Sequence, residues 1–272
     1  MLATLSQVCT LHAPFEKDLE DYAAGACRAV ELWLGKLETY LQSHSLRQVR
    51  ELVAEYQLSL PAASYQGGLF VAEGAARDAH WAHFQRRLQL CEELDIRTLI
   101  VAGDLAGPLD SAAFDRLRDS LHEAAERAVA RGVRLAFEFQ AGASFANNLQ
   151  TAASLIAEIS KPNLGICLDA FHFYNGPSKT EDLGLLTTEN LFHVQLSDVA
   201  GVPREWAKDA DRILPGDGDF PLAPLIKRLQ TIAYEGAVSV ELMNPQMWQI
   251  SPRQFGEIAI TALRKILGQA QN

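Results

Sequence analysis

Short β-rich runs alternate regularly with longer amphipathic segments along the whole chain, and this alternation limits the possible folds more than any other feature. The predicted strands cover residues 2–9, 28–34, 58–64, 97–102, 133–140, 164–170, 191–197 and 237–243. The helical patterns cover residues 15–24, 45–57, 76–94, 110–131, 148–160, 180–187, 222–233 and 252–269, and the sixth is interrupted by Gly184. Such a repeat predicts the α/β class and a closed (β/α)8 barrel, also called a TIM barrel, rather than an open sheet.

The length and composition agree with one barrel. The chain has 272 residues, and barrels of this type typically have about 250. Hydrophobic residues make up 48% of the chain and charged residues 21%, which provides for a large core and excludes general disorder. Because no linker-like stretch separates the repeats, residues 1–272 are predicted to form a single domain.

The charge and cysteine pattern narrow the expected partners. A formal net charge of -10 disfavours a phosphate-binding surface, so we expect small molecules or metal cations as partners and no nucleic acid. The widely spaced cysteines form no CxxC pair and indicate neither a zinc knuckle nor a disulfide framework. They are Cys9, Cys27, Cys91 and Cys167. With no signal-peptide pattern and no apolar run near roughly 18 residues, the sequence predicts a cytoplasmic protein without membrane contact. A homo-oligomer is an open alternative to a monomer.

Polar residues recur near the ends of the last four predicted strands. Alternate side chains of a barrel strand face the helices and the barrel interior. By this parity, Val194, Leu196 and Phe192 face the helices in the seventh strand. The four interior sets are Ala136, Glu138 and Gln140; Cys167 and Asp169; His193, Gln195 and Ser197; and Ser239 and Glu241. Barrel enzymes place their chemistry at these C-terminal strand ends.

The inward carboxylates indicate a bound cation, because three of them converging without one would repel each other. Oxygen atoms from Glu138, Asp169, Gln195 and Glu241 suit Mn²⁺ or Mg²⁺, and Zn²⁺ is a less favoured alternative because thiolates are absent and imidazole is scarce among the four. Singly, Glu138 could pair with an arginine, Asp169 could cap the next segment and Gln195 could satisfy backbone groups. Their equivalent positions in four consecutive strands favour one metal site. His193 lies deeper in the barrel than Gln195 and is predicted either to pack or to support one of the ligands.

Five stretches resemble the sugar phosphate isomerase/epimerase family, also called the xylose isomerase-like TIM barrel superfamily. They are "AFEF" at 136–139, "CLDAFHFY" at 167–174, "FHVQLSD" at 192–198, "DRILPGDGDFPL" at 211–222 and "VSVELMNP" at 238–245. In that family a glutamate, an aspartate, a histidine or glutamine, and a second glutamate hold one divalent metal, often Mn²⁺, Mg²⁺ or Co²⁺. The resemblance implies that Glu138, Asp169, Gln195 and Glu241 are the metal ligands in this chain, the same four residues that strand parity selects. The additional ligands of the related endonuclease IV branch are absent, which argues against a nuclease.

The resemblance also implies substrate contacts. It implies that His172 reaches a substrate oxygen and that Arg212 contacts the substrate; alternatively, His172 supports a carboxylate and Arg212 forms a surface salt bridge. Glu31 and Trp33 share parity in "AVELWL" and are predicted to line the pocket. The alternatives are that Trp33 belongs to the core and that Glu31 pairs with Lys36.

The predicted site indicates proton transfer next to a carbonyl. Four protein ligands leave about two positions on a six-coordinate ion, enough to chelate a carbonyl and a neighbouring hydroxyl of a carbohydrate-like molecule. Glu138 and Glu241 would remove and return a proton through an enediolate, giving an isomerase or epimerase. Expulsion of a β-hydroxyl would instead give a dehydratase, as in the inosose and 3-dehydroshikimate dehydratases of this superfamily. A catalytically silent sugar-binding protein is a third hypothesis. Whether the substrate is phosphorylated stays open.

Overall fold

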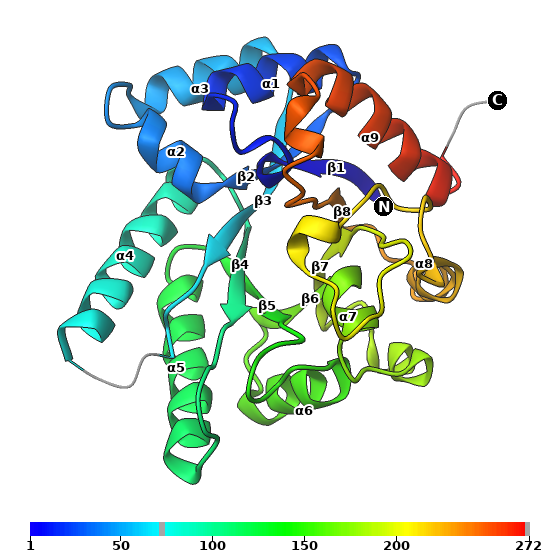
Figure 1. Cartoon of the computed structure of the whole chain (residues 1–272). Helices are drawn as coiled ribbons and strands as arrows, with labels where there is room; N and C mark the ends of the chain where they lie inside the picture. The colour runs from blue at the N-terminus through cyan, green and yellow to red at the C-terminus, as the bar shows by residue number, and fades with distance from the viewer. Residues whose placement is uncertain (71–73, 270–272) are drawn as a thin grey trace.

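The computed structural model describes residues 1–70 and 74–269 and shows a closed barrel of parallel strands in the order β1 to β8 (Figure 1). Each strand pairs with its sequence neighbours, and β8 closes onto β1 from Leu2–Ala237 to Leu5–Val240. The (β/α)8 prediction is therefore confirmed. The strands are β1 (Leu2–Ser6), β2 (Ala29–Trp33), β3 (Ser59–Gln66), β4 (Thr98–Gly103), β5 (Arg134–Phe139), β6 (Leu164–Asp169), β7 (Leu191–Leu196) and β8 (Ala237–Val240).

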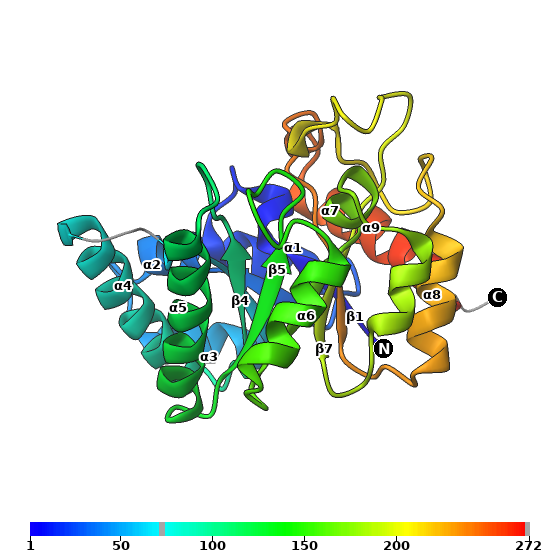
Figure 2. The same cartoon turned by 90° about the horizontal axis from the view of Figure 1, so that it is seen from below.

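Helices surround the barrel, and the loop that follows β7 extends beyond one end of it (Figures 1 and 2). Among the described residues, no helix has the length and apolar character that crossing a membrane requires. The α-helices are α1 (Phe15–Ala24), α2 (Leu34–Tyr40), α3 (Leu46–Glu55), α4 (Gly74–Glu93), α5 (Ser111–Val129), α6 (Leu149–Ile159), α7 (Ala170–Asn175), α8 (Leu222–Thr231) and α9 (Pro252–Ile266). Short 3-10 helices cover Gln7–Thr10, Thr180–Leu185, Asp209–Asp211 and Met247–Gln249.

Several helices begin where a polar side chain caps the first free backbone N–H groups. Asp110 Oδ1 accepts from the Ala113 N–H at 2.7 Å at the start of α5. At the start of α7, Asp169 Oδ1 accepts from the Phe171 N–H at 2.9 Å. The alternative that Asp169 caps the next segment is therefore correct for its Oδ1 atom. Its other oxygen, Oδ2, is left for a second role.

The structure departs from the sequence prediction at short segments. The strand predicted over 2–9 ends at Ser6, because Gln7 and Thr10 turn into a 3-10 helix and both hydrogen-bond to the buried Asp18. The helix predicted over 180–187 is instead the 3-10 helix Thr180–Leu185. The short helices α2 and α7 directly follow their strands and were not predicted.

The barrel interior has an apolar floor. Its cluster of buried residues contains Ala62, Ile100, Ala136, Cys167 and Phe192. Phe192 was predicted to face the helices, and that prediction is wrong. The β6–β7 register shifts between Ile166 and Cys167, pairing them with Leu191 and His193, so Phe192 is skipped and turns into the interior. Polar side chains then occupy the upper part of the barrel.

Gly165 in β6 provides a test of how tightly the barrel wall is packed. An added Cβ would lie 2.7 Å from the Asn190 carbonyl oxygen and 2.7 Å from the Phe192 ring. We expect Gly165→Ala to lower the free energy of unfolding by about 1–3 kcal/mol, the usual cost of overpacking. Urea unfolding checks this. Gly184→Ala is the control, because nothing lies within 4 Å of its added Cβ. Equal free energies of unfolding for the two variants would contradict the prediction.

Candidate active site

The four predicted metal ligands lie at one end of the barrel interior, and all four are buried. Glu138 lies in β5, Asp169 ends β6, Gln195 lies in β7, and Glu241 directly follows β8. The predicted strand over 237–243 is shorter than expected, but the Glu241 N–H still donates to the Leu196 carbonyl at 3.1 Å. This hydrogen bond extends the strand geometry by one residue and keeps Glu241 directed inward.

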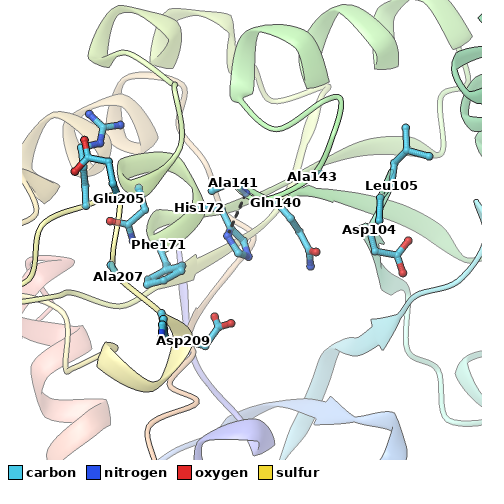
Figure 3. Close-up of a pocket in the computed structure, with 15 residues that line it drawn as sticks. Asp104, Leu105, Gln140, Ala141, Ala143, Phe171, His172, Glu205, Ala207 and Asp209 are labelled. Carbon is cyan, nitrogen blue, oxygen red and sulfur yellow. Dashed lines mark hydrogen bonds between the residues drawn. The ribbon is translucent and has the colours of Figure 1, made fainter. Parts of the chain in front are cut away.

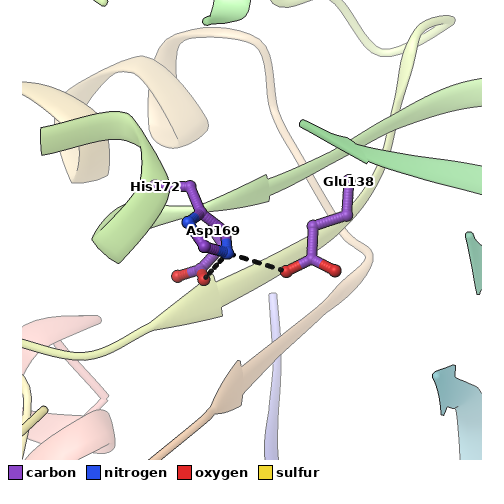
Figure 4. A group of neighbouring side chains, drawn as sticks. All are labelled: Glu138, Asp169 and His172. Atoms are coloured by element: carbon purple, nitrogen blue, oxygen red, sulfur yellow. Dashed lines mark ion pairs between the residues drawn. The ribbon is translucent and has the colours of Figure 1, made fainter. Parts of the chain in front are cut away.

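Glu138, Asp169 and His172 converge from β5, β6 and α7 (Figure 4). The His172 Nε2 atom lies 3.7 Å from Glu138 Oε1 and 3.7 Å from Asp169 Oδ2. One potential ligand atom from each residue lies within 4.8 Å of the others. The Ala141 N–H donates to His172 Nδ1 at 3.4 Å, which makes Nε2 the protonated nitrogen and directs a donor toward the carboxylates.

Burial changes the protonation of these groups. It raises the pKa of Glu138 to about 8, with repulsion from Asp169 adding to the effect and Arg212 opposing it. Burial also raises the pKa of Glu241 well above its ordinary value, against the attraction of Arg212. For His172, burial lowers the pKa although Asp169 opposes the shift, so the imidazole is neutral at pH 7.

The carboxylate cluster fits a hard divalent cation. Asp169 Oδ2 is buried and has no hydrogen bond of acceptable geometry, although Arg212 Nη2 lies 2.8 Å away. Glu138 has His172 Nε2 at 3.7 Å, beyond hydrogen-bond length. Oxygen atoms that are buried and incompletely satisfied are the donors that Mg²⁺ or Mn²⁺ binds.

The raised pKa values predict how the metal-free protein responds to pH. A carboxyl group whose pKa is higher in the folded state stabilises the fold below its unfolded pKa, and this stability is lost as the pH rises through the folded value. Glu138, with a model-compound value of 4.5 and a folded pKa of about 8, and Asp18, with a folded pKa of about 7, both have this sign. We therefore expect the melting temperature in chelator to fall from about pH 6 to about pH 8.5.

Differential scanning calorimetry at several pH values checks this expectation. Excess Mg²⁺ should reduce the fall, because a bound cation favours the ionised carboxylates. Glu138→Gln should reduce it as well, since the variant has no group to titrate at that position. A melting temperature that rises over the same pH interval would contradict the prediction.

Gln195 is positioned at the centre of the cluster, with its amide nitrogen toward the carboxylates. Its Nε2 donates to Glu241 Oε1 at 2.9 Å and to Glu31 Oε1 at 3.1 Å. Its Oε1 accepts from Cys167 Sγ at 3.2 Å. Because an amide nitrogen does not ligate a cation, metal ligation by Gln195 requires a half-turn of the amide. The ligand role of Gln195 stays a prediction with this condition attached.

Arg212 is completely buried within the cluster, so the surface salt-bridge alternative is wrong. Its Nη1 donates to Glu241 Oε2 at 3.1 Å, and its Nη2 lies 2.8 Å from Asp169 Oδ2. Its Nε donates to Asp209 Oδ1 at 2.9 Å, and the guanidinium lies 4.2 Å from the centroid of the Phe171 ring. The arginine thus connects two predicted ligands to the loop above them.

Asp198 fixes the loop that carries Arg212. This buried carboxylate accepts from the backbone N–H groups of Val199 at 2.9 Å, Phe220 at 2.9 Å and Gly216 at 3.0 Å. The backbones of Asp198 and Ile213 also pair with each other. The segment on both sides of Ile213 is therefore attached to the end of β7.

Glu31 lies beneath the cluster instead of on an open pocket wall. It is fully buried, and its Oε1 accepts from Ser64 Oγ at 2.6 Å and from Ser6 Oγ at 3.1 Å. His193 Nε2 lies 2.7 Å from Glu31 Oε2 and 3.1 Å from Ser239 Oγ. Burial would raise the pKa of Glu31, but the attraction and hydrogen bond of His193 lower it overall. Glu31 and His193 therefore form the polar layer that supports Gln195.

The alternative pairing of Glu31 with Lys36 is wrong, because Lys36 Nζ forms a short ion pair with Asp18. Trp33 is partly buried and stacks on Tyr65, with ring centroids 6.0 Å apart. Its backbone N–H donates to Gln7 Oε1 at 3.1 Å. A contact between Trp33 and substrate stays a prediction.

A cavity of about 560 Å³ opens beside the cluster (Figure 3). Its walls come from the loops after β4 and β5, from α7 and from the segment 204–209. His172 and Asp209 belong both to this wall and to the groups around the carboxylates. Asp104 on the opposite wall accepts from the Gly68 N–H at 2.8 Å. Strand parity carried no signal for Asp104 or Asp209, because Asp104 lies in the loop after β4 and Asp209 begins the short 3-10 helix Asp209–Asp211.

The sequence model of the family described as "Xylose isomerase-like TIM barrel" matches residues 20–265. The chain belongs to the xylose isomerase-like TIM barrel family. The match covers most of the chain, including the segments that provide Glu138, Asp169, Gln195 and Glu241.

Curated relatives of this xylose isomerase-like chain have more than one activity. A 3-dehydroshikimate dehydratase of Pseudomonas aeruginosa is 30% identical over an alignment of 274 positions, which covers 98% of this chain and 41% of the relative. An inosose isomerase of Halalkalibacterium halodurans is 32% identical over 135 residues, which are 49% of this chain and 48% of the relative. The chain therefore spans about two fifths of the length of the dehydratase that it matches.

Solved structures agree with the xylose isomerase-like fold. A crystal structure of the IOLI protein with a binding zinc atom has a TM-score of 0.92 at 22% identity and covers 99% of both chains. A D-psicose 3-epimerase in the presence of D-fructose has a TM-score of 0.79 at 20% identity, covering 98% of this chain and 100% of the epimerase. These similarities show the shared barrel.

Proposed function

We propose that this chain is a divalent-metal-dependent isomerase or epimerase that moves a proton next to the carbonyl of a small carbohydrate-like substrate. The observation that carries the proposal is the buried cluster of Glu138 and Asp169 with His172. Arg212 connects Asp169 to a third buried carboxylate, Glu241. Among the described residues, Arg212 is the only lysine or arginine within ion-pair distance of these carboxylates. One guanidinium does not balance three carboxylates, and a divalent ion would.

The proposed ligands are Glu138, Asp169, Glu241 and, after a half-turn of its amide, Gln195. A divalent ion held there would polarise a substrate carbonyl and acidify the neighbouring C–H group. The family resemblance and the donor chemistry both favour Mn²⁺ or Mg²⁺, and the zinc atom in the related IOLI structure keeps Zn²⁺ as an alternative.

Glu138 and Glu241 are the proposed proton carriers. They come from β5 and from the end of β8, the two outer members of the four-strand set, and so approach the cluster from different sides. One carboxylate would remove the proton and the other would return it, and such a positioned base typically contributes 10²–10⁴-fold to the rate. Burial raises the pKa of both carboxyl groups, which favours their taking up a proton.

His172 is the proposed contact to a substrate hydroxyl. Its Nε2–H is directed toward the cluster, and its ring lines the cavity of about 560 Å³. This volume lies within the roughly 300–1,000 Å³ of small-molecule sites. A neutral imidazole with a fixed proton can donate to a hydroxyl without adding charge to the site.

A dehydratase is the second candidate, favoured by the match to a 3-dehydroshikimate dehydratase over 98% of this chain. The same proton removal next to a carbonyl would then be followed by loss of a β-hydroxyl. The C–O bond breaks, the electron pair of the former C–H bond forms the new double bond, and the departing hydroxyl takes up the proton that the basic carboxylate removed, so that it leaves as water and the carboxylate is restored. The two candidates therefore differ only after the first step.

One experiment tests the proposal and separates the candidates. The Mg²⁺-loaded protein is incubated in D₂O with a panel of ketoses, inososes and 3-dehydroshikimate, and products are followed by NMR, with a chelator-treated sample as the control. Deuterium next to the carbonyl without loss of water supports an isomerase or epimerase, whereas an unsaturated product supports the dehydratase. Absence of both while a panel compound binds would favour the sugar-binding hypothesis and contradict catalysis.

A further inference from the structure

The guanidinium of Arg212 lies between two of the proposed metal ligands. Its Nη2 is 2.8 Å from Asp169 Oδ2, and its Nη1 donates to Glu241 Oε2 at 3.1 Å. The side chain is completely buried. Below the guanidinium, the Asn244 side chain donates to the Arg212 carbonyl at 3.0 Å, which helps to fix the backbone at this position.

Neutralising buried carboxylates is essential for folding, because unpaired buried charges are strongly destabilising. Arg212 supplies one permanent positive charge to Asp169 and Glu241 in the protein without metal, since a guanidinium does not lose its proton in proteins. A divalent ion bound by the same carboxylates would experience repulsion from this charge. Two cations therefore compete for the same two residues.

We infer that Arg212 is an internal counter-ion that stabilises the metal-free fold and limits the affinity of the site for divalent metal. The inference rests on the proposed metal site and adds a role for Arg212 that a substrate contact does not require. Metal binding would release the guanidinium from at least one carboxylate, and Asp169 Oδ2 is the first candidate because its contact with Nη2 lacks hydrogen-bond geometry.

A second partner for the released guanidinium is already in place. Asp209 Oδ1 lies 2.9 Å from Arg212 Nε and 2.8 Å from Nη2, and the Asp209 side chain is 48% exposed. Asp209 also lines the cavity beside the cluster. A guanidinium that leaves Asp169 can therefore keep its bond to Asp209 and lie closer to the cavity, where it would meet the substrate only after metal has bound.

The test compares Mn²⁺ affinity and metal-free stability in the wild type and Arg212→Gln. By calorimetry we expect Arg212→Gln to bind Mn²⁺ about tenfold more tightly, because the competing charge is gone. Its melting temperature in chelator should be lower than that of the wild type, so Mn²⁺ should raise its melting temperature by more.

If Arg212→Gln does not fold without metal, Arg212→Lys is measured in its place, because it keeps a positive charge in the cluster and hence the fold. An ammonium is a single point charge and neutralises the two carboxylates less completely, so we expect Mn²⁺ affinity about threefold above the wild type. Arg87→Gln is the matched control: Arg87 is a buried arginine that pairs with Glu38. Its loss should lower the melting temperature without changing Mn²⁺ affinity.

The outcomes separate this inference from the metal site on which it rests. Arg212 variants that bind Mn²⁺ no more tightly than the wild type would overturn the inference and leave the site intact. A wild type and variants that all fail to bind divalent metal would overturn the proposed site and the inference together. Tighter binding in Arg87→Gln as well would show a general effect of losing an arginine, which would also overturn the inference.

Discussion

Asp169→Asn should abolish tight binding of divalent metal. The substitution keeps a side-chain oxygen that can accept from the Phe171 N–H and cap α7, but it removes the negative charge of the most fully buried of the three carboxylates. Replacing a residue that only hydrogen-bonds to a metal ligand typically costs about 10–100-fold in metal affinity. Loss of a charged ligand itself should therefore cost at least about 100-fold. Isothermal titration with Mn²⁺ measures this difference.

His193→Asn is the control for the loss at Asp169. His193 is buried beside Gln195, and its Nε2 bonds to Glu31 and Ser239 below the cluster. We expect a smaller change in Mn²⁺ affinity than for Asp169→Asn. Unchanged affinity in Asp169→Asn would show that the proposed site is wrong. An equal loss in His193→Asn would instead move the third ligand from Gln195 to His193.

Glu241→Gln should reduce turnover by at least the roughly 10²-fold that a general base usually contributes, even at saturating metal. The variant keeps the side-chain volume and one ligand oxygen, but it loses a negative charge and a group that accepts protons. Metal affinity should therefore fall moderately while proton transfer falls strongly. The measurement is solvent exchange of the substrate proton next to the carbonyl, in D₂O with excess Mg²⁺, on the compound that the NMR panel identifies.

The stability of Glu241→Gln distinguishes catalysis from a structural role. Burial raises the pKa of Glu241 well above its ordinary value, so replacing the carboxylate by a neutral amide removes the cost of burying its charge. In chelator the variant should melt no lower than the wild type. A strong decrease in that melting temperature would show that the bonds to Gln195 and Arg212 are structural, and near-normal exchange would assign the base to Glu138 or His172.

The barrel was predictable from the regular alternation of strands and helices, and the inward carboxylates were predictable from the period of two within each strand. Glu138, Asp169, Gln195 and Glu241 lie where strand parity places them, buried at one end of the barrel. Their ligand role stays a prediction, and for Gln195 the parity argument selected the residue but could not give the direction of its amide. That direction depends on hydrogen bonds to Glu31, Glu241 and Cys167 from three other strands.

Other features escaped prediction because they depend on contacts far apart in the sequence. The turn of Phe192 into the barrel results from the register shift between β6 and β7, which no alternation within "FHVQLSD" reveals. The burial of Arg212 depends on Asp169 and Glu241, from two different strands. Asp209 begins the short 3-10 helix Asp209–Asp211, outside the strands, so strand parity gives no information about its place beside Arg212.

The attachment of the Ile213 segment to Asp198 divides the loop after β7 into two parts with different prospects for protein engineering. Residues 213–220 are held by the Asp198 carboxylate and backbone, so insertions there would displace Arg212 from the cluster. Residues 200–208 lie before that anchor, and Arg204 and Lys208 among them line the cavity. Grafting a different sequence over 200–208 is therefore the route by which this barrel could be given a new substrate preference while its carboxylate cluster is left undisturbed.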